Sequence, residues 1–223
     1  MRMILIGLGL GLGLAFALPV AAAPVTAAAP DDEVWFGGTT RALRSASANA
    51  LTEDNLGGAV LGYAREVVVL GQALALWAET GMTIDTAHGA MFQVLHTRIG
   101  VTDLTAGLRV RYQLHRRIAA SARLDAGAQR AAIEISGGGA LATDTTWGAL
   151  ASAALAIDLL AVAGPRFNFG VRAELGYVRA QARSIKLHSD TGSPALQLPL
   201  MDAALGELDL SGATFGVSLV GGF

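Results

Sequence analysis

The chain has 223 residues, of which 52% are hydrophobic and 28 are glycine, and its mean hydropathy is +0.48. The formal charge of −2, without a basic patch, argues against a nucleic-acid partner, and the lack of cysteine excludes disulfides, thiolate metal sites and cysteine nucleophiles. Beyond the N-terminus no run of about 18 residues is free of charge, as a spanning helix would require, and the nearest run, residues 147–164, contains Asp158.

The first 23 residues are predicted to be an export signal. Arg2 gives a positive start, residues 4–18 form an apolar run, and three alanines at 21–23 supply the small residues of a cleavage site. The alternating glycines at 7, 9, 11 and 13 resemble a nucleotide-binding loop, but no strand precedes them, so an export signal is favoured. Residues 24–33, which begin with an alanine- and proline-rich stretch, are predicted to be a flexible tail.

Eight later segments are predicted to be strands. The clearest pair, residues 103–114 and 118–135, places apolar and polar side chains at alternate positions around a polar break at 115–117, which indicates an antiparallel hairpin. The facing of the first three strands is left open because they alternate poorly. In chain order the predicted strands are 34–43, 56–65, 67–79, 103–114, 118–135, 146–160, 167–183 and 208–223.

The connections between these strands alternate in length. Those after the second, fourth and sixth strands have only a few residues, whereas those after the first, third, fifth and seventh are long or polar, including residues 80–102 and 188–206. Short turns at one end and longer loops at the other are typical of bacterial outer-membrane barrels, which have an even number of strands of about ten residues.

In the predicted strands with the clearest alternation, the polar face carries charged residues. An arginine facing lipid would cost roughly 2 to 4 kcal/mol at the bilayer midplane, whereas an eight-stranded barrel is just wide enough to be filled by inward side chains. We therefore predict a lumen ion network of Arg109, Arg111, Arg123, Asp125, Asp158, Arg172 and Glu174, and aromatic girdles at the membrane interfaces that contain Tyr112, Trp147, Phe167, Tyr177 and Phe223.

Membrane helices are an alternative for residues 148–164 and 118–133. The second segment does not suit a helix, because Arg123, Asp125 and Arg130 would lie on different sides of it. The sequence therefore favours an all-β chain, with residues 34–223 forming an eight-stranded antiparallel up-and-down transmembrane β-barrel.

Three segments resemble the small eight-stranded outer-membrane barrels, namely the OmpA-type transmembrane domain and its OmpX- and OmpW-like relatives. They are LGGAVLGYAREV from Leu56, LTAGLRVRYQL from Leu104 and FGVRAELGY from Phe169, and the last strand ends in Phe223, which resembles the signal that the barrel assembly machinery reads. Gly221 departs from that signal, which usually has a large side chain there. The sequence ends at Phe223, so we expect no peptidoglycan-binding domain. The resemblance implies a location in the bacterial outer membrane.

The expected function is a structural or loop-mediated binding role, because a self-compensating ion network in the lumen argues against a wide pore. A narrow ion channel is one alternative. Another is an enzyme that modifies outer-membrane lipid, which would need His96 or His188 beside a serine at the rim. No cofactor or metal is expected. The expected partners are outer-membrane lipid and the barrel assembly machinery, and the apolar stretch 195–205 is expected to cover the barrel mouth or to contact lipid.

Overall fold

The computed structural model describes residues 30–52, 55–71, 73–91, 95–137, 140–189 and 203–223. The predicted export signal, most of the predicted tail and most of the apolar stretch 195–205 lie outside these residues. The last residues of the predicted tail are part of the first strand, which begins at Asp32.

Eight strands form a closed antiparallel ring. Each of the strands β1 to β6 pairs with the next one along the chain, β7 pairs with β10, and β10 pairs with β1. The elements are β1 (Asp32–Leu43), α1 (Ala46–Leu51), β2 (Leu56–Val69), β3 (Leu74–Met91), β4 (Leu95–His115), β5 (Ile118–Gly137), β6 (Ala140–Ala163), β7 (Asn168–Ala180), β8 (Arg183–Ser189), β9 (Ala203–Leu208) and β10 (Gly212–Gly222).

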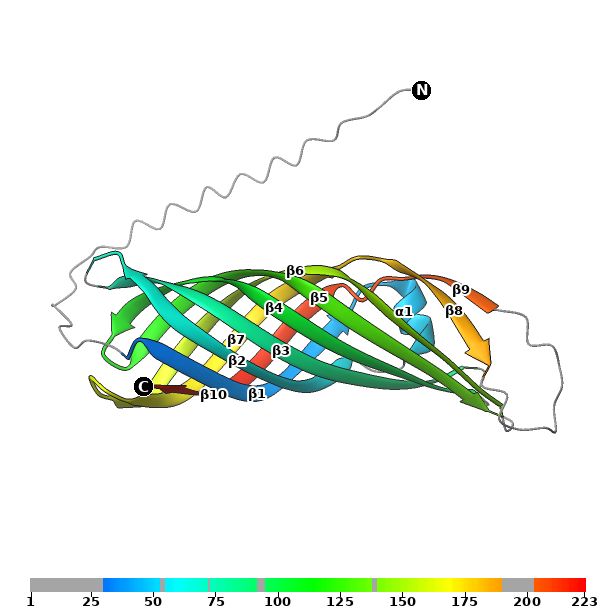
Figure 1. Ribbon diagram of the computed structural model, residues 1–223. Coiled ribbons are helices and arrows are strands. Elements are labelled where there is room, and N and C mark those ends of the chain that lie inside the picture. Colours follow the sequence, from blue (N-terminus) through cyan, green and yellow to red (C-terminus); the bar gives the residue numbers. More distant parts are fainter. Residues whose placement is uncertain (1–29, 53–54, 72, 92–94, 138–139, 190–202) are drawn as a thin grey trace, which may run out of the picture.

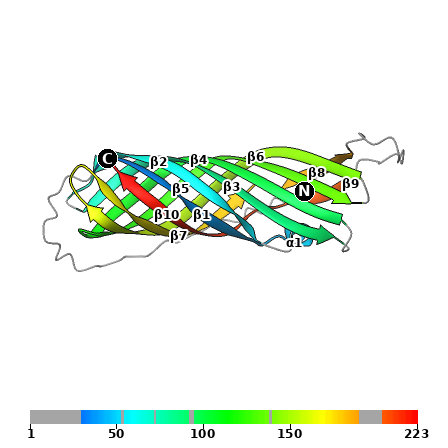
Figure 2. The same ribbon diagram turned by 90° about the horizontal axis from the view of Figure 1, so that it is seen from below.

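The strands of the ring are staggered. When register partners are followed once around the ring from Leu43 through Gly212, the path returns to β1 at Glu33 instead of Leu43. A stagger of this kind requires tilted strands, and both views of the barrel show them (Figures 1 and 2).

The two ends of the barrel differ. One end, which we call the turn end, carries the connections β2–β3, β4–β5 and β6–β7 together with the start of β1 and the end of β10 (Figure 1). The opposite end, the loop end, carries α1 and the β8–β9 hairpin, and β8 pairs with the loop end of β6. Within the described residues no helix is long and apolar enough to cross a membrane.

The prediction of a long connection at residues 80–102 was wrong. β3 continues to Met91 and β4 begins at Leu95, so most of these residues are paired strand. The turn predicted next to Glu66 was also misplaced, because a β-bulge between Glu66 and Val68 interrupts the alternation and the turn comes after Val69. The predicted loop before residue 146 likewise belongs largely to β6.

Large apolar side chains cover the outside of the ring. Leu124 on β5 is 69% exposed and Leu155 on β6 is 66% exposed. Each of the six remaining ring strands also contributes outward apolar side chains. We call this surface the apolar belt. It includes Phe36, Leu61, Met82, Leu104, Leu108, Leu124, Leu155, Ile157, Leu175, Phe215 and Leu219.

Beyond the belt, toward the loop end, the polarity of the strands is inverted. Outward positions become polar, as at Thr102 and Arg130, while inward positions become apolar and buried, as at Ile99 and Ile133. We call this part the outer extension: residues 86–91, 95–102, 130–137 and 140–147 together with α1, β8 and β9. Its core, to which the adjoining ends of β1, β2 and β7 and the segment after β9 also contribute, contains Leu43, Ala48, Leu51, Leu56, Ala87, Ile99, Val101, Ala131, Ile133, Ile135, Ala180, Ile185, Leu208 and Leu210.

Candidate functional site: the filled lumen

Near the turn end, the lumen is filled by a group of charges around Glu33, which is 1% exposed. Its carboxylate oxygens lie 2.7 Å from Nη1 of Arg109, 2.8 Å from Nη1 of Arg111 and 2.8 Å from Nη2 of Arg172. Asp158 completes the group, 2.7 Å from Nε of Arg172 and 3.5 Å from Nη2 of Arg111. We call these five residues the Glu33 cluster, and it joins strands β1, β4, β6 and β7 across the barrel.

Two buried tryptophans pack against this cluster. The Arg109 guanidinium lies 5.6 Å from the Trp35 ring and 5.1 Å from the Trp77 ring, and Arg172 lies 5.4 Å from Trp35. A desolvated guanidinium over an aromatic face gains electrostatic attraction from the ring, so the tryptophans support the charges and fill space. Gly62 on β2 makes this possible, because a Cβ at that position would overlap the Trp35 ring.

A second branch of charges lies on the loop-end side of the Glu33 cluster. Arg123 on β5 contacts Glu174 at 2.6 Å, Glu79 at 3.3 Å and Asp125 at 3.3 Å. The carboxylate of Glu79 also lies 3.5 Å from Nε of Arg109, so the branch is continuous with the Glu33 cluster. The side chain of Ser152 donates a hydrogen bond to Asp125 at 3.0 Å.

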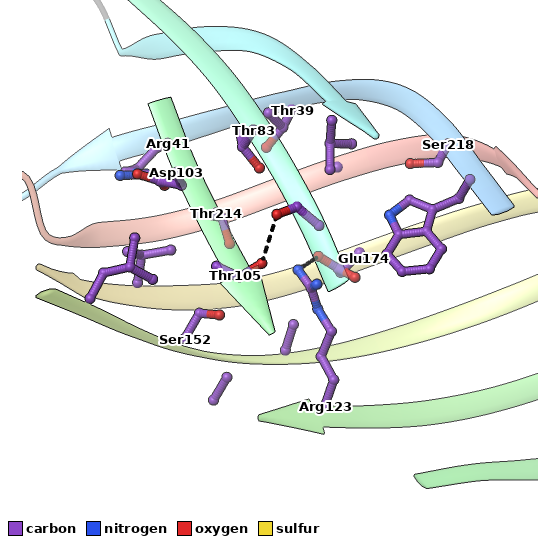
Figure 3. A pocket seen from close by; sticks show the side chains of 18 residues that line it. Thr39, Arg41, Thr83, Asp103, Thr105, Arg123, Ser152, Glu174, Thr214 and Ser218 are labelled. Atoms are coloured by element: carbon purple, nitrogen blue, oxygen red, sulfur yellow. Dashed lines mark hydrogen bonds and ion pairs between the residues drawn. The ribbon is translucent and has the colours of Figure 1, made fainter. Parts of the chain in front are cut away.

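A cavity of about 50 Å³ lies beside Arg123 and Glu174 (Figure 3). Hydroxyl groups dominate the polar part of its wall, which includes Thr39, Thr83, Thr105, Ser152, Thr214 and Ser218. A cavity needs about 10 to 15 Å³ to hold one water molecule, so this one has room for a few, with hydroxyl partners on several sides. It does not continue as a wide pore, because packed side chains lie on both sides of it.

Toward the loop end the cavity is bounded by a cluster around Arg41. The Arg41 guanidinium pairs with Asp103 and lies 3.4 Å from Asp85. Gln129 donates to Asp103 at 2.9 Å, and Arg183 of β8 donates to Gln129 at 3.2 Å. Partial burial lowers the pKa of Arg183 from its ordinary value, although the Asp103 carboxylate acts in the opposite direction.

The apolar core of the outer extension closes the lumen above Arg41. Helix α1 begins after Ser45, whose side chain accepts a hydrogen bond from the Ala48 amide at 3.5 Å. At its other end the Leu51 carbonyl accepts a hydrogen bond from the Thr97 hydroxyl of β4. Gly89 of β3 lets the helix end approach closely, because a Cβ there would overlap the Leu51 carbonyl.

The structure brings the seven predicted network residues into the lumen. Arg109, Arg111, Arg172 and Asp158 belong to the Glu33 cluster, and Arg123, Asp125 and Glu174 form the adjacent branch. Sequence reasoning missed five further members, Glu33, Arg41, Glu79, Asp85 and Asp103. Glu33 and Arg41 lie two and six residues from Trp35 on the same inward face, a periodicity that could have indicated them.

The predicted girdle residues divide between the two ends. Tyr112, Phe167 and Phe223 lie near the turn end, whereas Trp147 and Tyr177 lie near the loop-end edge of the belt. Trp147 and Phe223 are each 58% exposed, and Tyr112 is half-buried.

The predicted enzyme alternative required a histidine beside a serine at the rim. His96 of β4 and Ser136 of β5 are register partners in the outer extension, but no hydrogen bond joins their side chains in the described part of the chain. His115 lies at the turn end, where it accepts a hydrogen bond from the Arg117 amide at 3.4 Å. Among the residues that the structure describes, no group of three or more histidine, aspartate and glutamate side chains could hold a metal ion.

No family model and no curated protein matches the chain. Among solved structures, it is similar to Neisserial surface protein A, with a TM-score of 0.50, 8% identity and coverage of 87% of this chain and 97% of that one. It is also similar to Ail, the attachment invasion locus protein of Yersinia pestis, with a TM-score of 0.47, 12% identity and the same coverage. The likeness to the Neisserial protein extends to the fold, and with the closed ring of paired strands it confirms the predicted eight-stranded antiparallel up-and-down barrel.

Proposed function

We propose that the protein is an integral barrel of the bacterial outer membrane, with a closed lumen, that holds the outer extension at the cell surface for a structural or binding role. The observation that carries the proposal is the opposite polarity of the two faces of the ring strands. Leu124 and Leu155 face outward, whereas Arg109 and Arg172 face inward and are paired.

The outside of the ring supports membrane insertion. Monomeric soluble proteins rarely expose a continuous apolar patch of more than a few hundred Å², whereas the apolar belt extends around all eight ring strands. A closed ring also leaves no unpaired strand edge in the belt, which a hydrocarbon environment requires because it offers no hydrogen-bond partners to the backbone.

The inside of the ring supports a closed lumen. The Glu33 cluster bridges four strands at the turn end, and the apolar core of the outer extension fills the loop end. A solute would have to displace both, and the first would leave charges unpaired in a poorly hydrated interior. The proposal therefore includes neither conduction nor catalysis, and it assigns any binding of external partners to the outer extension.

Two partners follow from the same proposal. Membrane lipid would cover the apolar belt. The barrel assembly machinery would deliver the last strand, β10, whose pairing with β1 closes the ring; Phe223, which follows β10, is 58% exposed at the turn end.

Heat modifiability tests the proposal directly. Outer membranes are extracted with detergent, and the protein is run on a gel before and after boiling; a folded closed barrel is expected to migrate differently from the boiled chain. Planar-bilayer recordings of the same preparation are expected to show no discrete conductance steps. Recovery in the soluble fraction without a gel shift would refute the membrane location, and stepwise conductance would refute the closed lumen.

A further inference from the structure

Arginines mark the loop-end edge of the apolar belt over several neighbouring strands. Arg130 projects outward from β5, Arg179 projects outward from β7, and Arg44 follows the end of β1. All three side chains are exposed. Within the described residues none of them forms an ion pair, in contrast to the arginines of the lumen.

Aromatic side chains lie at the same level as these arginines. Trp147 of β6 is the register partner of Arg130, and the Arg44 guanidinium lies 5.9 Å from the ring of Tyr177. Trp and Tyr at the end of an apolar surface are typical of the level at which lipid headgroups lie. The arginines are thus placed where headgroups of the loop-end leaflet would meet them.

Most of the outward side chains between Arg130 and Arg179 are short. Strand β6 separates the two arginines, and its outward residues there are Trp147, the register partner of Arg130, then Ala149, and then Ala151, the register partner of Arg179. The short side chains of Ala149 and Ala151 leave room for a headgroup between the two arginines, with Trp147 at its loop-end side. The outward positions next along β5, Ala126 and Ala128, are also small and exposed, so an acyl chain can lie close to the barrel wall below the headgroup.

We infer that this edge binds the phosphate monoester headgroup of an anionic lipid in the loop-end leaflet, with Arg130 and Arg179 as its two cationic contacts. A guanidinium presents a planar pair of donors that matches phosphate oxygens, and these two have no competing carboxylate in the described structure. Arg44 and Trp147 flank the headgroup position. The inference rests on the proposed membrane location and gives it a lipid class.

The test compares two double variants that lose the same charge. R130Q/R179Q removes both contacts, whereas R116Q/R117Q removes two exposed arginines from the β4–β5 turn at the opposite end of the barrel. Each refolded barrel is first checked for its heat-dependent gel shift. Binding of phosphatidic acid and of phosphatidylcholine with identical acyl chains is then measured by native mass spectrometry from detergent micelles.

The unaltered barrel and R116Q/R117Q are expected to prefer phosphatidic acid, and R130Q/R179Q is expected to lose about tenfold or more of that preference. Equal preference in R130Q/R179Q and the unaltered barrel would overturn the inference, as would an equal loss in both double variants, which would indicate net charge alone. Full competition by inorganic phosphate at the concentration of the lipid would also overturn it, because the site would then take the free anion. A barrel that shifts on heating yet shows no lipid preference refutes this inference while leaving the proposed function in place.

Discussion

The belt region and the outer extension are built from the same strands, yet their inner and outer faces are reversed. In the belt part of β4, Arg109 and Arg111 face inward while Leu108 faces outward. Nearer the loop end of the same strand, Ile99 and Val101 face inward and Arg98 is exposed. In both parts the pleat of the strand directs alternate side chains inward and outward, so the two parts differ only in which residue types occupy the inward and outward positions. A single continuous strand thus presents an apolar outer face in one part and a polar outer face in the next by inverting its pattern.

The two interiors are also held together by different forces. The belt interior depends on charges that are buried and mutually paired, whereas the interior of the outer extension depends on apolar contacts, as in a soluble domain. The following substitutions separate the two regions, and they are ordered by expected effect.

The largest effect is expected from E33Q. The substitution removes the carboxylate that three buried arginines share, and an uncompensated buried charge costs about 3 to 5 kcal/mol. The free energy of unfolding is measured by urea titration of the barrel in lipid vesicles. The control E134Q changes an exposed glutamate of the outer extension and is expected to alter stability by less than about 0.5 kcal/mol. Equal effects of the two would contradict a central role for Glu33.

I133A tests the interior of the outer extension. Ile133 is buried in its apolar core, and truncation of a buried isoleucine to alanine costs about 2 to 5 kcal/mol. The loss is expected to appear as faster amide hydrogen exchange in residues 95–102 and 130–137, with the belt strands unchanged. If exchange accelerates equally in the belt, the two regions unfold as one unit and the distinction between their interiors is wrong.

L155R tests the outside of the belt. Leu155 is 66% exposed on β6, and an arginine facing hydrocarbon costs roughly 2 to 4 kcal/mol near the midplane. The matched control is T145R, which places the same side chain on the outward face of the same strand but in the outer extension, where little change is expected. Folding yield into vesicles measures both. A yield for T145R as low as that of L155R would place the edge of the belt beyond residue 145.

The smallest effect is expected from S152A. Ser152 donates a hydrogen bond to Asp125 and lines the cavity, so its loss should cost about 0.5 to 1.5 kcal/mol, because water in the cavity can replace part of the contact. The urea midpoint measures it, and S184A, which changes an exposed serine of β8, serves as a reference. A cost close to that of E33Q would indicate that the cavity is dry.

The belt was predictable from the sequence because its outward side chains are uniformly apolar and its inward side chains are polar. Residues 103–114 and 118–128 alternate on either side of a polar turn, and an arginine facing lipid would be costly, so the hairpin and the inward positions of Arg109, Arg111 and Arg123 could be assigned. The outer extension was not predictable in this way. Its outward faces carry threonine, histidine and arginine, so residues 80–102 read as a polar connection although they are strand.

Local context concealed the remaining site residues. Glu33 follows two aspartates and an alanine- and proline-rich stretch, so it reads as part of a solvated tail. Its spacing from Trp35 places it on the inward face, but its contacts with β4 and β7 are visible only in the folded chain. Asp85 and Asp103 lie at the boundary between the belt and the outer extension, where the inward positions change from polar to apolar. Their pairing with Arg41 depends on contacts between strands far apart in the sequence, which no local pattern contains.

The position of Glu33 on the first strand has a consequence for the order of assembly. Its three guanidinium partners are supplied by the fourth and seventh strands, and the ring that brings them together is completed only when the last strand pairs with the first. Before the ring closes, Arg109 and Arg111 lack the Glu33 carboxylate, whereas Arg172 can already pair with Asp158 on the neighbouring strand. The contacts of Glu33 therefore belong to the closing step of folding, in which the first strand meets the strands that follow it in the chain.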